Sequence, residues 1–205
     1  VTGDLGEAVA QAGFVQESAP ERADLKRALH ARLGELVPDG VVIASSTSGI
    51  PMTEIQRDCP SPGRTVIGHP FNPPYLLPLV EIVGGERTDA NAVEWARAFY
   101  AAAGKEPLVM NREIPGFVAT RLQEALWREA LHMVAAGEAT PAQIDAALMH
   151  GPAPRMVVQG QCMAFHVACG EGGMATNLDQ FGPALALPWT RSEEHTSELQ
   201  SLSHI

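Results

Sequence analysis

Short apolar runs and amphipathic stretches alternate along the first half of the chain. Five apolar runs predict β-strands, at residues 14–17, 40–47, 65–69, 78–83 and 107–111. The run at 40–47, GVVIASST, does not alternate between apolar and polar residues, which is typical of a strand buried on both faces of a parallel sheet. We therefore expect a sheet whose two faces are both covered by helices.

The amphipathic stretch at residues 20–36 predicts a helix. Leu25, Leu29, Leu33 and Leu36 recur in it at helical spacing, so these side chains are expected to form its buried face. Two further helices are expected, one shortly after the proline at position 51 and one over residues 90–103. The order strand, helix, strand, helix indicates an α/β doubly wound layer.

Helix-end signals support the predicted boundaries. Asp89 stands at the N-cap of the helix over 90–103, and Gly104 follows its last turn. In the second half, Thr140 and Gln143 form a capping box that starts a helix ending at Gly151.

The pattern changes at residues 112–115, where strands cease. A long helix is expected over residues 116–136, and Phe117 is expected on its apolar side. Residues 152–189 contain no convincing strand and are expected to be helical with glycine breaks. We therefore predict an α/β part over residues 1–113 and an all-α part over residues 114–190.

The last 15 residues, RSEEHTSELQSLSHI, differ abruptly in composition from the residues before them. They resemble the translation of a sequencing-adapter oligonucleotide, so residues 191–205 are interpreted as an adapter-derived scar. A genuine polar tail is the alternative.

Composition narrows the possible functions. The chain is 45% hydrophobic and 19% charged, which is typical of a globular protein. Its net charge of −10 disfavours partners such as nucleic acid or an anionic membrane. No apolar run approaches the roughly 18 residues of a membrane span. The opening residues lack a signal-peptide pattern, and the three unpatterned cysteines suit reduced thiols, so a cytoplasmic location is expected.

Three polar residues stand at strand ends and carry the candidate chemistry. Ser48 follows one apolar run, His69 lies in VIGHP, and Glu81 lies in PLVEI. Ligands of open parallel sheets bind beyond the carboxyl ends of the strands, which suits Ser48 and His69. A carboxylate that orients a histidine is the arrangement of a general base. Each residue also has an ordinary explanation, as a hydrogen-bonded core histidine, a solvated glutamate or a turn serine.

Two other kinds of site are alternatives to this pair. The order Ser, His, Glu also fits a hydrolase triad, but Ser48 lies in STSGI and not in a G-x-S-x-G elbow. Cys162, His166 and Cys169 could bind zinc, but a structural zinc site needs four ligands and no fourth is near. Hydrolysis is therefore the less favoured chemistry, and no metal is expected.

Several segments carry a family resemblance. The stretches ASSTSGIPM (44–52), IGHPFNPPYLLPLVEIV (67–83) and IPGFVATRLQEALWREALHMV (114–134) resemble the 3-hydroxyacyl-CoA dehydrogenase superfamily. Residues 14–29 and 166–190 resemble its carnitine-oxidising branch in particular. The resemblance implies a partial Rossmann-type sheet, the C-terminal part of an NAD-binding domain, followed by a truncated all-α substrate and dimerisation domain.

The resemblance also implies catalytic roles, because Ser48, His69 and Glu81 stand at the family's spacing. His69 would take the proton from the substrate's secondary hydroxyl as hydride leaves for nicotinamide. Glu81 would orient His69, and Ser48 would hydrogen-bond the reacting oxygen. The implied reaction is NAD-dependent oxidation of the 3-hydroxyl of carnitine, with 3-hydroxyacyl-CoA and L-gulonate as alternative substrates.

Cofactor and substrate contacts are implied at further positions. Ser48 would lie near the nicotinamide ribose, Asn72 would contact the nicotinamide amide, and Glu21 and Lys26 would contact NAD. Thr120 stands where the hydroxyacyl-CoA enzymes have a substrate-site asparagine, and its shorter reach weakens the acyl-CoA interpretation.

The family's phosphate-binding loop is missing from this sequence. No G-x-G-x-x-G occurs before residue 14. We expect the chain to begin inside the dinucleotide-binding domain and, alone, to bind NAD weakly and be inactive. A non-catalytic remnant is the alternative. The full-length protein is expected to be a homodimer that binds a small 3-hydroxy acid such as carnitine.

A quaternary-ammonium substrate needs aromatic faces and a partner for its carboxylate. The aromatic candidates are Phe71, Trp127, Phe165 and Trp189, and the cationic candidates are Arg121 and Arg155. For each aromatic residue a place in the core is the more common explanation, and for each arginine a solvated position is.

Overall fold

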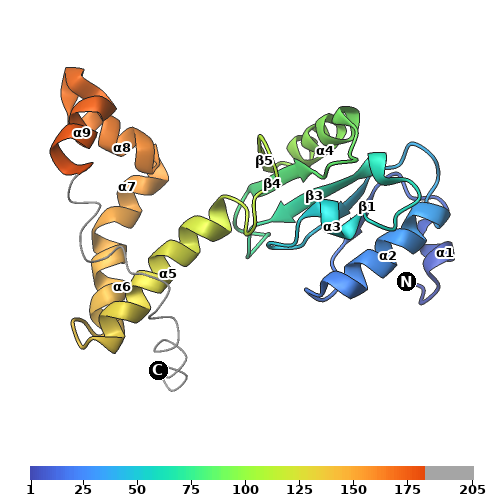
Figure 1. Ribbon diagram of the computed structural model, residues 1–205, viewed down its shortest axis with the longest axis horizontal. Helices are drawn as coiled ribbons and strands as arrows, with labels where there is room; N and C mark the ends of the chain where they lie inside the picture. The colour runs from blue at the N-terminus through green and yellow to red at the C-terminus, as the bar shows by residue number, and fades with distance from the viewer. Residues whose placement is uncertain (183–205) are drawn as a thin grey trace. The chain divides into compact units, whose positions relative to one another are not determined.

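The computed structural model describes residues 1–182, and the chain forms two compact units that divide between Leu122 and Gln123 (Figure 1). Unit 1 is an α/β layer and unit 2 is all helical, as the sequence predicts. In residues 1–182, no helix combines the length and the apolar character that crossing a membrane requires.

A five-stranded sheet forms the centre of unit 1. Its strands lie in the order β1 (Val15–Glu17), β2 (Ile43–Ser45), β3 (Thr65–Pro70), β4 (Leu79–Gly84) and β5 (Glu106–Val109). Strands β1, β2 and β3 are parallel, whereas β4 is antiparallel to β3 and parallel to β5. The parallel surroundings expected for the strand at 40–47 are confirmed for β2, and the sheet as a whole is mixed because β3 and β4 form an antiparallel pair. The proline-rich loop 71–78 turns the chain straight back, so no crossover helix separates β3 from β4.

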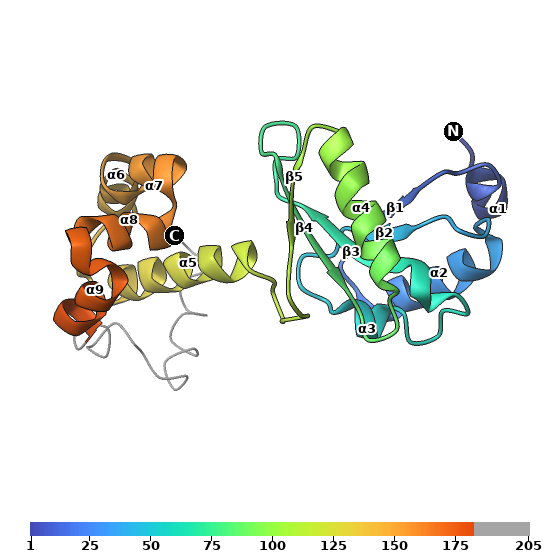
Figure 2. The same ribbon diagram turned by 90° about the horizontal axis from the view of Figure 1, so that it is seen from above.

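Helices cover both faces of this sheet (Figure 2). They are α1 (Leu5–Val9), α2 (Ala23–Leu36), α3 (Met52–Ile55) and α4 (Ala90–Ala102), with a 3-10 turn at Pro62–Arg64. Val66 of β3 packs in a core with α4, while its neighbour Ile67 packs with α3 on the opposite face. Ile43 of β2 packs with α1 and α2, and Ala44 with α4. Burial of both faces explains why these strands are continuously apolar.

Helix α2 buries only part of the predicted leucine face: Leu33 lies in the core and Leu29 packs against it. Its buried residues are Lys26, His30, Leu33 and Gly34, whereas Leu25 and Leu36 are 38% and 41% exposed. The leucine spacing did not predict the burial of Lys26, whose ammonium group pairs with the buried carboxylate of Glu17. Apolar periodicity does not register such an ion pair.

One predicted helix start differs from the structure, and another agrees with it but lacks the expected side-chain cap. Helix α5 (Ala119–Ala135) begins three residues later than predicted, because Gly116 and Phe117 have positive φ angles of 71° and 50°. Phe117 is fully buried in the core of unit 1 and does not lie on the helix's apolar side. Asp89 is the N-cap of α4, but its carboxylate makes no capping bond; its backbone N–H donates to the Gly63 carbonyl at 2.8 Å.

Unit 2 consists of helices joined by short glycine-containing turns. Helix α5 continues from unit 1 and is followed by α6 (Pro141–His150), α7 (Pro152–Gln159), α8 (Gln161–Ala168), a 3-10 turn at Gly170–Gly172 and α9 (Gly173–Phe181). The capping box of Thr140 and Gln143 is confirmed, and Gly151 and Gly160 separate helices as expected. The interpretation of residues 191–205 as a scar concerns positions outside the described residues.

Candidate active site

His69 and Glu81 face each other across the antiparallel strands β3 and β4. The two residues are direct partners in the strand register, and His69 Nδ1 lies 3.0 Å from Glu81 Oε2. The exposed fraction of His69 is 7% and that of Glu81 is 0%. The alternative of a solvated glutamate is therefore wrong, and the pair has the geometry of an oriented imidazole.

The second carboxylate oxygen of Glu81 also accepts hydrogen bonds. Oε1 accepts hydrogen bonds from the backbone N–H groups of Val118 (2.9 Å) and Ala119 (2.8 Å), at the start of α5. Burial raises the pKa of Glu81, but the hydrogen bonds from His69 and from these two amides outweigh burial and lower it. The carboxylate is therefore ionised at neutral pH, so His69 Nδ1 is assigned as the donor and Nε2 as the free acceptor.

Aromatic rings stand beside the imidazole. The ring centroids of Phe71 and Phe117 lie 6.1 and 5.6 Å from that of His69. Phe71 lies in the loop after β3, and Phe117 precedes α5. Apolar neighbours keep water away from the His–Glu pair and so strengthen its electrostatic interaction.

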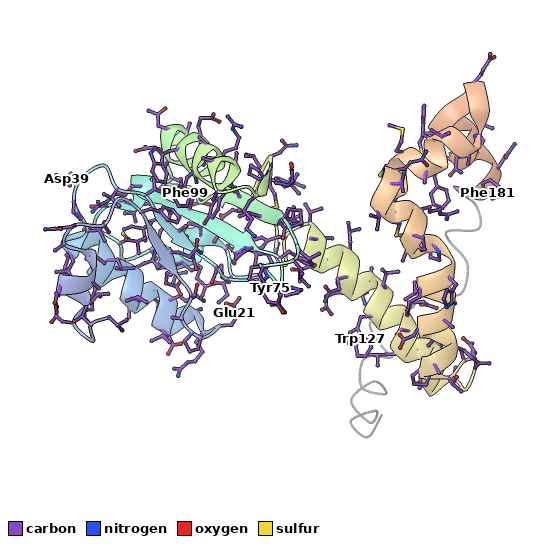
Figure 3. All side chains as sticks on the ribbon, turned by 180° about the vertical axis from the view of Figure 1, so that it is seen from behind. Glu21, Asp39, Tyr75, Phe99, Trp127 and Phe181 are labelled. Carbon is purple, nitrogen blue, oxygen red and sulfur yellow. The ribbon has the colours of Figure 1, made fainter. Side chains whose placement is uncertain are left out.

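Ser48 and Glu21 lie together at the carboxyl edge of β1 and β2. Glu21 Oε1 accepts from the Ser48 backbone N–H at 2.8 Å and from the Thr47 hydroxyl at 2.5 Å. Residue Ser48 is exposed. Parallel strands β1, β2 and β3 end at one edge, which brings Glu21, Ser48 and His69 to the same side of the sheet. Figure 3 shows Glu21 and Tyr75, from the segments after β1 and β3, at this edge.

The other predicted site residues occupy different environments. Asn72 is exposed in the loop after β3, and Thr120 is half-buried in the first turn of α5. Lys26 is only 1% exposed, and its Nζ donates to Glu17 Oε1 and to the Ala19 carbonyl, both at 2.9 Å. The sequence predictions overlooked Glu17, although its position at the end of a strand was a usable signal.

Family models match both parts of the chain. One described as "3-hydroxyacyl-CoA dehydrogenase, NAD binding domain" matches residues 1–114, and one described as "3-hydroxyacyl-CoA dehydrogenase, C-terminal domain" matches residues 116–192. The chain belongs to the 3-hydroxyacyl-CoA dehydrogenase family.

Curated relatives in this family include L-carnitine dehydrogenases. That of Streptomyces griseus is 64% identical over 193 residues, which are 94% of this chain and 58% of the relative. That of Pseudomonas putida is 51% identical over 186 residues, 91% of this chain and 58% of the relative. The chain thus spans about three-fifths of the length of these relatives.

Solved structures agree with the family assignment. A 5-formyl-3-hydroxy-2-methylpyridine 4-carboxylic acid 5-dehydrogenase, described as NAD+-dependent, is 31% identical with a TM-score of 0.85, over 98% of this chain and 65% of that one. A 3-hydroxybutyryl-CoA dehydrogenase from Escherichia coli is 35% identical with a TM-score of 0.66, over 72% and 31% of the two chains.

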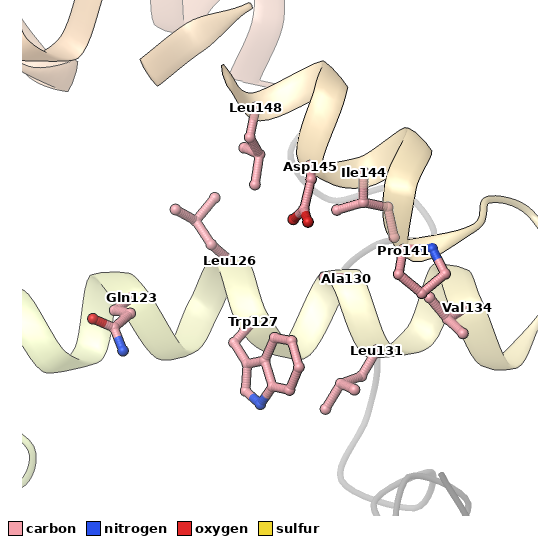
Figure 4. Close-up of a pocket in the computed structure, with 10 residues that line it drawn as sticks. All are labelled: Gln123, Leu126, Trp127, Ala130, Leu131, Val134, Pro141, Ile144, Asp145 and Leu148. Carbon is pink, nitrogen blue, oxygen red and sulfur yellow. The ribbon is translucent and has the colours of Figure 1, made fainter. Parts of the chain in front are cut away.

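In this family member, the helical unit has a hollow of its own. It has a volume of about 410 Å³ and lies between α5 and α6 (Figure 4). Asp145 is the one titratable residue among those that line it, and the rest are mainly apolar, such as Leu126, Trp127 and Ile144. It offers no base with an orienting partner, so the His69–Glu81 pair remains the candidate active site of the described chain.

The candidate substrate-binding side chains belong to both units of the chain. The guanidinium carbon of Arg155 lies 5.8 Å from the centroid of the Phe165 ring, so these two candidates contact each other in unit 2. Trp127 is 57% exposed on α5. Trp189 lies outside the described residues. Phe71 is the aromatic candidate whose ring stands beside His69.

Proposed function

We propose that this chain is part of an NAD-dependent L-carnitine dehydrogenase, which oxidises the 3-hydroxyl group of L-carnitine to give 3-dehydrocarnitine. The observation that carries the proposal is the 3.0 Å contact between His69 Nδ1 and Glu81 Oε2, which leaves Nε2 free to accept a proton. The identity of 64% to a curated L-carnitine dehydrogenase supports the choice of substrate.

The residues at the sheet edge suit the nicotinamide half of NAD. Ser48 and Asn72 are exposed polar residues near the ends of β2 and β3, where ligands of such sheets bind. In the proposal, Ser48 and Asn72 hold the ribose and the carboxamide, and Glu21 and Lys26 lie beside the cofactor. NAD, when bound, accepts the hydride.

The protein's own part in the reaction is to orient the alcohol and to move its proton. His69 Nε2 takes the proton of the 3-hydroxyl group, and Ser48 donates a hydrogen bond to the reacting oxygen. The imidazolium that results is stabilised by the ionised Glu81, which already accepts from Nδ1. Thr120, next to an amide that binds Glu81, is proposed to contact the substrate.

We also propose a domain organisation, an oligomeric state and a cellular location for the protein. Residues 1–113 would be the C-terminal part of an NAD-binding Rossmann domain, and residues 114–190 part of a helical substrate and dimerisation domain. Exposed apolar side chains in unit 2, such as Val157 (87%) and Val158 (82%), support an interface in a full-length homodimer. A cytoplasmic location is also proposed, and the three cysteines, which are all free thiols, support it.

Residues 1–190, joined to those segments of the Streptomyces griseus relative that they do not cover, give a protein that we call the completed enzyme. NADH production by this enzyme should be measured in parallel with L-carnitine, a short 3-hydroxyacyl-CoA and L-gulonate. The proposal expects the highest kcat/KM with L-carnitine. A higher value with either other substrate would contradict the substrate assignment, and no activity with any of them would favour a non-catalytic remnant.

A further inference from the structure

A buried carboxylate lies behind the proposed cofactor edge. Glu17 is the last residue of β1, it is 4% exposed, and its register partner is Ser45, the last residue of β2. The Ser45 hydroxyl donates to Glu17 Oε2 at 2.6 Å, and the Ala19 N–H donates to Oε1 at 2.5 Å. The carboxylate therefore joins two strand ends and the start of the loop before α2.

Lys26 is the counter-charge of Glu17. Its Nζ donates to Glu17 Oε1 at 2.9 Å and to the Ala19 carbonyl at 2.9 Å, and it lies 3.6 Å from Glu21 Oε2. These three oxygens surround the ammonium group, which is almost completely shielded from solvent. Glu17 thus fixes the position of the Lys26 ammonium group, and that group also contacts the carboxylate of Glu21.

Glu21 links Lys26 to the loop that follows β2. Its Oε1 accepts from the Thr47 hydroxyl and from the Ser48 N–H. A continuous series of contacts therefore runs from Glu17 through Lys26 and Glu21 to Ser48.

The chemistry of this series argues against a role in stability alone. Burial raises the pKa of Glu17, but the donors around its carboxylate more than offset this and hold the pKa at about 2. His30 Nε2 lies 3.5 Å from Glu17 Oε2, and His30 is fully buried. A buried ion pair contributes little to stability compared with well-packed apolar residues, so its presence suggests that a fixed geometry is needed.

We infer that Glu17 is a positioning residue of the dinucleotide site: it holds Lys26, and through Lys26 and Glu21 it sets the loop that carries Ser48. This inference rests on the proposed function, because the edge it organises is the proposed nicotinamide site. Glu17 itself has no contact with the reacting atoms.

The test compares Glu17→Asp with Glu35→Gln in the completed enzyme. The aspartate keeps the charge that Lys26 needs but withdraws the carboxylate by one methylene group, so it cannot reach Ser45 and Lys26 together. Glu35 is an exposed residue of the same helix α2 and serves as the control. The first readout is the dissociation constant of NADH, measured by fluorescence titration, with thermal unfolding followed in parallel.

The expected result is a rise of about tenfold in the NADH dissociation constant of Glu17→Asp, corresponding to the loss of roughly 1.4 kcal/mol. The KM for NAD should rise with it, while kcat changes less and its pH profile keeps its shape, because the His69–Glu81 pair is untouched. Glu35→Gln should match the parent. A purely structural role would lower the unfolding temperature without changing NADH affinity, and that outcome would overturn the inference.

A charge-neutral variant provides an independent check. Glu17→Gln alone deprives the buried ammonium of Lys26 of its nearest counter-charge and is expected to destabilise the fold, whereas Glu17→Gln combined with Lys26→Met removes both charges. The double variant should recover the parent's unfolding temperature but not its NADH affinity. Recovery of both would show that the series of contacts is not needed and would overturn the inference.

This inference and the proposed function can fail separately. If the completed enzyme oxidises none of the three substrates while Glu17→Asp still weakens NADH binding, only the proposed function fails. If L-carnitine is oxidised and Glu17→Asp binds NADH as the parent does, only the role of Glu17 fails.

Discussion

Glu81 holds His69 with one carboxylate oxygen and the backbone N–H of Ala119 with the other, at 3.0 and 2.8 Å. One buried charge therefore orients the imidazole and also satisfies the first turn of α5. Helix N-termini stabilise negative charge because their N–H groups are unpaired and their dipole is positive. The orientation of the proposed base thus depends on two backbone amides that lie 37 and 38 residues beyond Glu81 in the chain.

Replacing His69 by alanine should remove the base while leaving the sheet intact. In the completed enzyme, we expect kcat to fall by about 10²- to 10⁴-fold, the usual contribution of a general base. His150→Ala, at an exposed position on α6, is the matched control and should retain the parent's kcat. Steady-state NADH production checks both variants, and near-normal turnover by His69→Ala would refute the base assignment.

Glu81→Gln should separate the two tasks of the carboxylate. A glutamine has a single acceptor oxygen, so it can serve the amides of Val118 and Ala119 or His69 Nδ1, but not both. We expect the oxygen to stay on the two fixed amides and the NH₂ group to face His69. The imidazole then adopts the tautomer that is protonated at Nε2 and cannot accept a proton.

The expected result for Glu81→Gln is a fall in kcat of roughly 10³- to 10⁴-fold. Hydrogen exchange at the amides of Val118 and Ala119 should stay close to that of the parent, because their acceptor remains. Fast exchange with preserved kcat would show that the side chain had made the opposite choice.

Glu17 should make the α/β unit sensitive to acid. Its pKa is about 2 in the folded chain against an ordinary value of 4.5, so folding keeps it ionised. This contribution is fully present above pH 4.5 and is lost as pH falls through about 2, because the unfolded chain then binds the proton more readily.

The loss is on the order of 3 kcal/mol of the free energy of unfolding between about pH 5 and pH 2. The depressed pKa of Glu81 acts in the same direction. Urea titrations followed by circular dichroism should show a shallower pH dependence for the double variant Glu17→Gln/Lys26→Met than for the parent. Equal slopes would contradict the assignment.

Gly68 should resist substitution because of its close neighbour Tyr100. A Cβ at Gly68 would overlap the Tyr100 hydroxyl, which donates to Gln16, while Gln16 Nε2 donates to the Gly68 carbonyl at 3.1 Å. We expect Gly68→Ala to cost about 1–3 kcal/mol of unfolding free energy, the usual penalty of overpacking. Gly13→Ala, where a Cβ would meet nothing within 4 Å, should stay within about 0.5 kcal/mol of the parent.

Because Gly68 precedes His69 in β3, Gly68→Ala should also lower kcat in the completed enzyme, whereas Gly13→Ala should not. Adding Tyr100→Phe removes the overlapping hydroxyl and should recover part of the lost stability. No recovery would locate the clash elsewhere.

Residues 1–190 alone should bind NAD weakly, because their sequence contains no G-x-G-x-x-G before residue 14 to hold the pyrophosphate. Isothermal titration calorimetry should give a dissociation constant well above the micromolar range. The completed enzyme, with the relative's own N-terminal segment, is the positive control. A micromolar constant for residues 1–190 would contradict the expectation.

Local sequence signals were sufficient for most elements of the fold. Continuous apolar runs predicted the five strands, because strands buried on both faces need no polar alternation. The capping box at Thr140 and Gln143 predicted the start of α6, since both partners lie within one helical turn. The same kind of reasoning singled out His69 and Glu81, but it placed both at strand ends, whereas Glu81 lies in the middle of β4, and it left their pairing as one alternative among several.

The tertiary structure decided which groups meet. The direction of β4 makes Glu81 the register partner of His69, and the return of the chain at Phe117 brings two amides to the same carboxylate. Lys26 is buried on α2, where the leucine pattern was only half right, because its ammonium group pairs with Glu17 at the end of a neighbouring strand. A sequence pattern reports whether a residue resembles buried ones, but the ionisation and role of a buried polar group depend on partners that only the folded chain brings within hydrogen-bond distance.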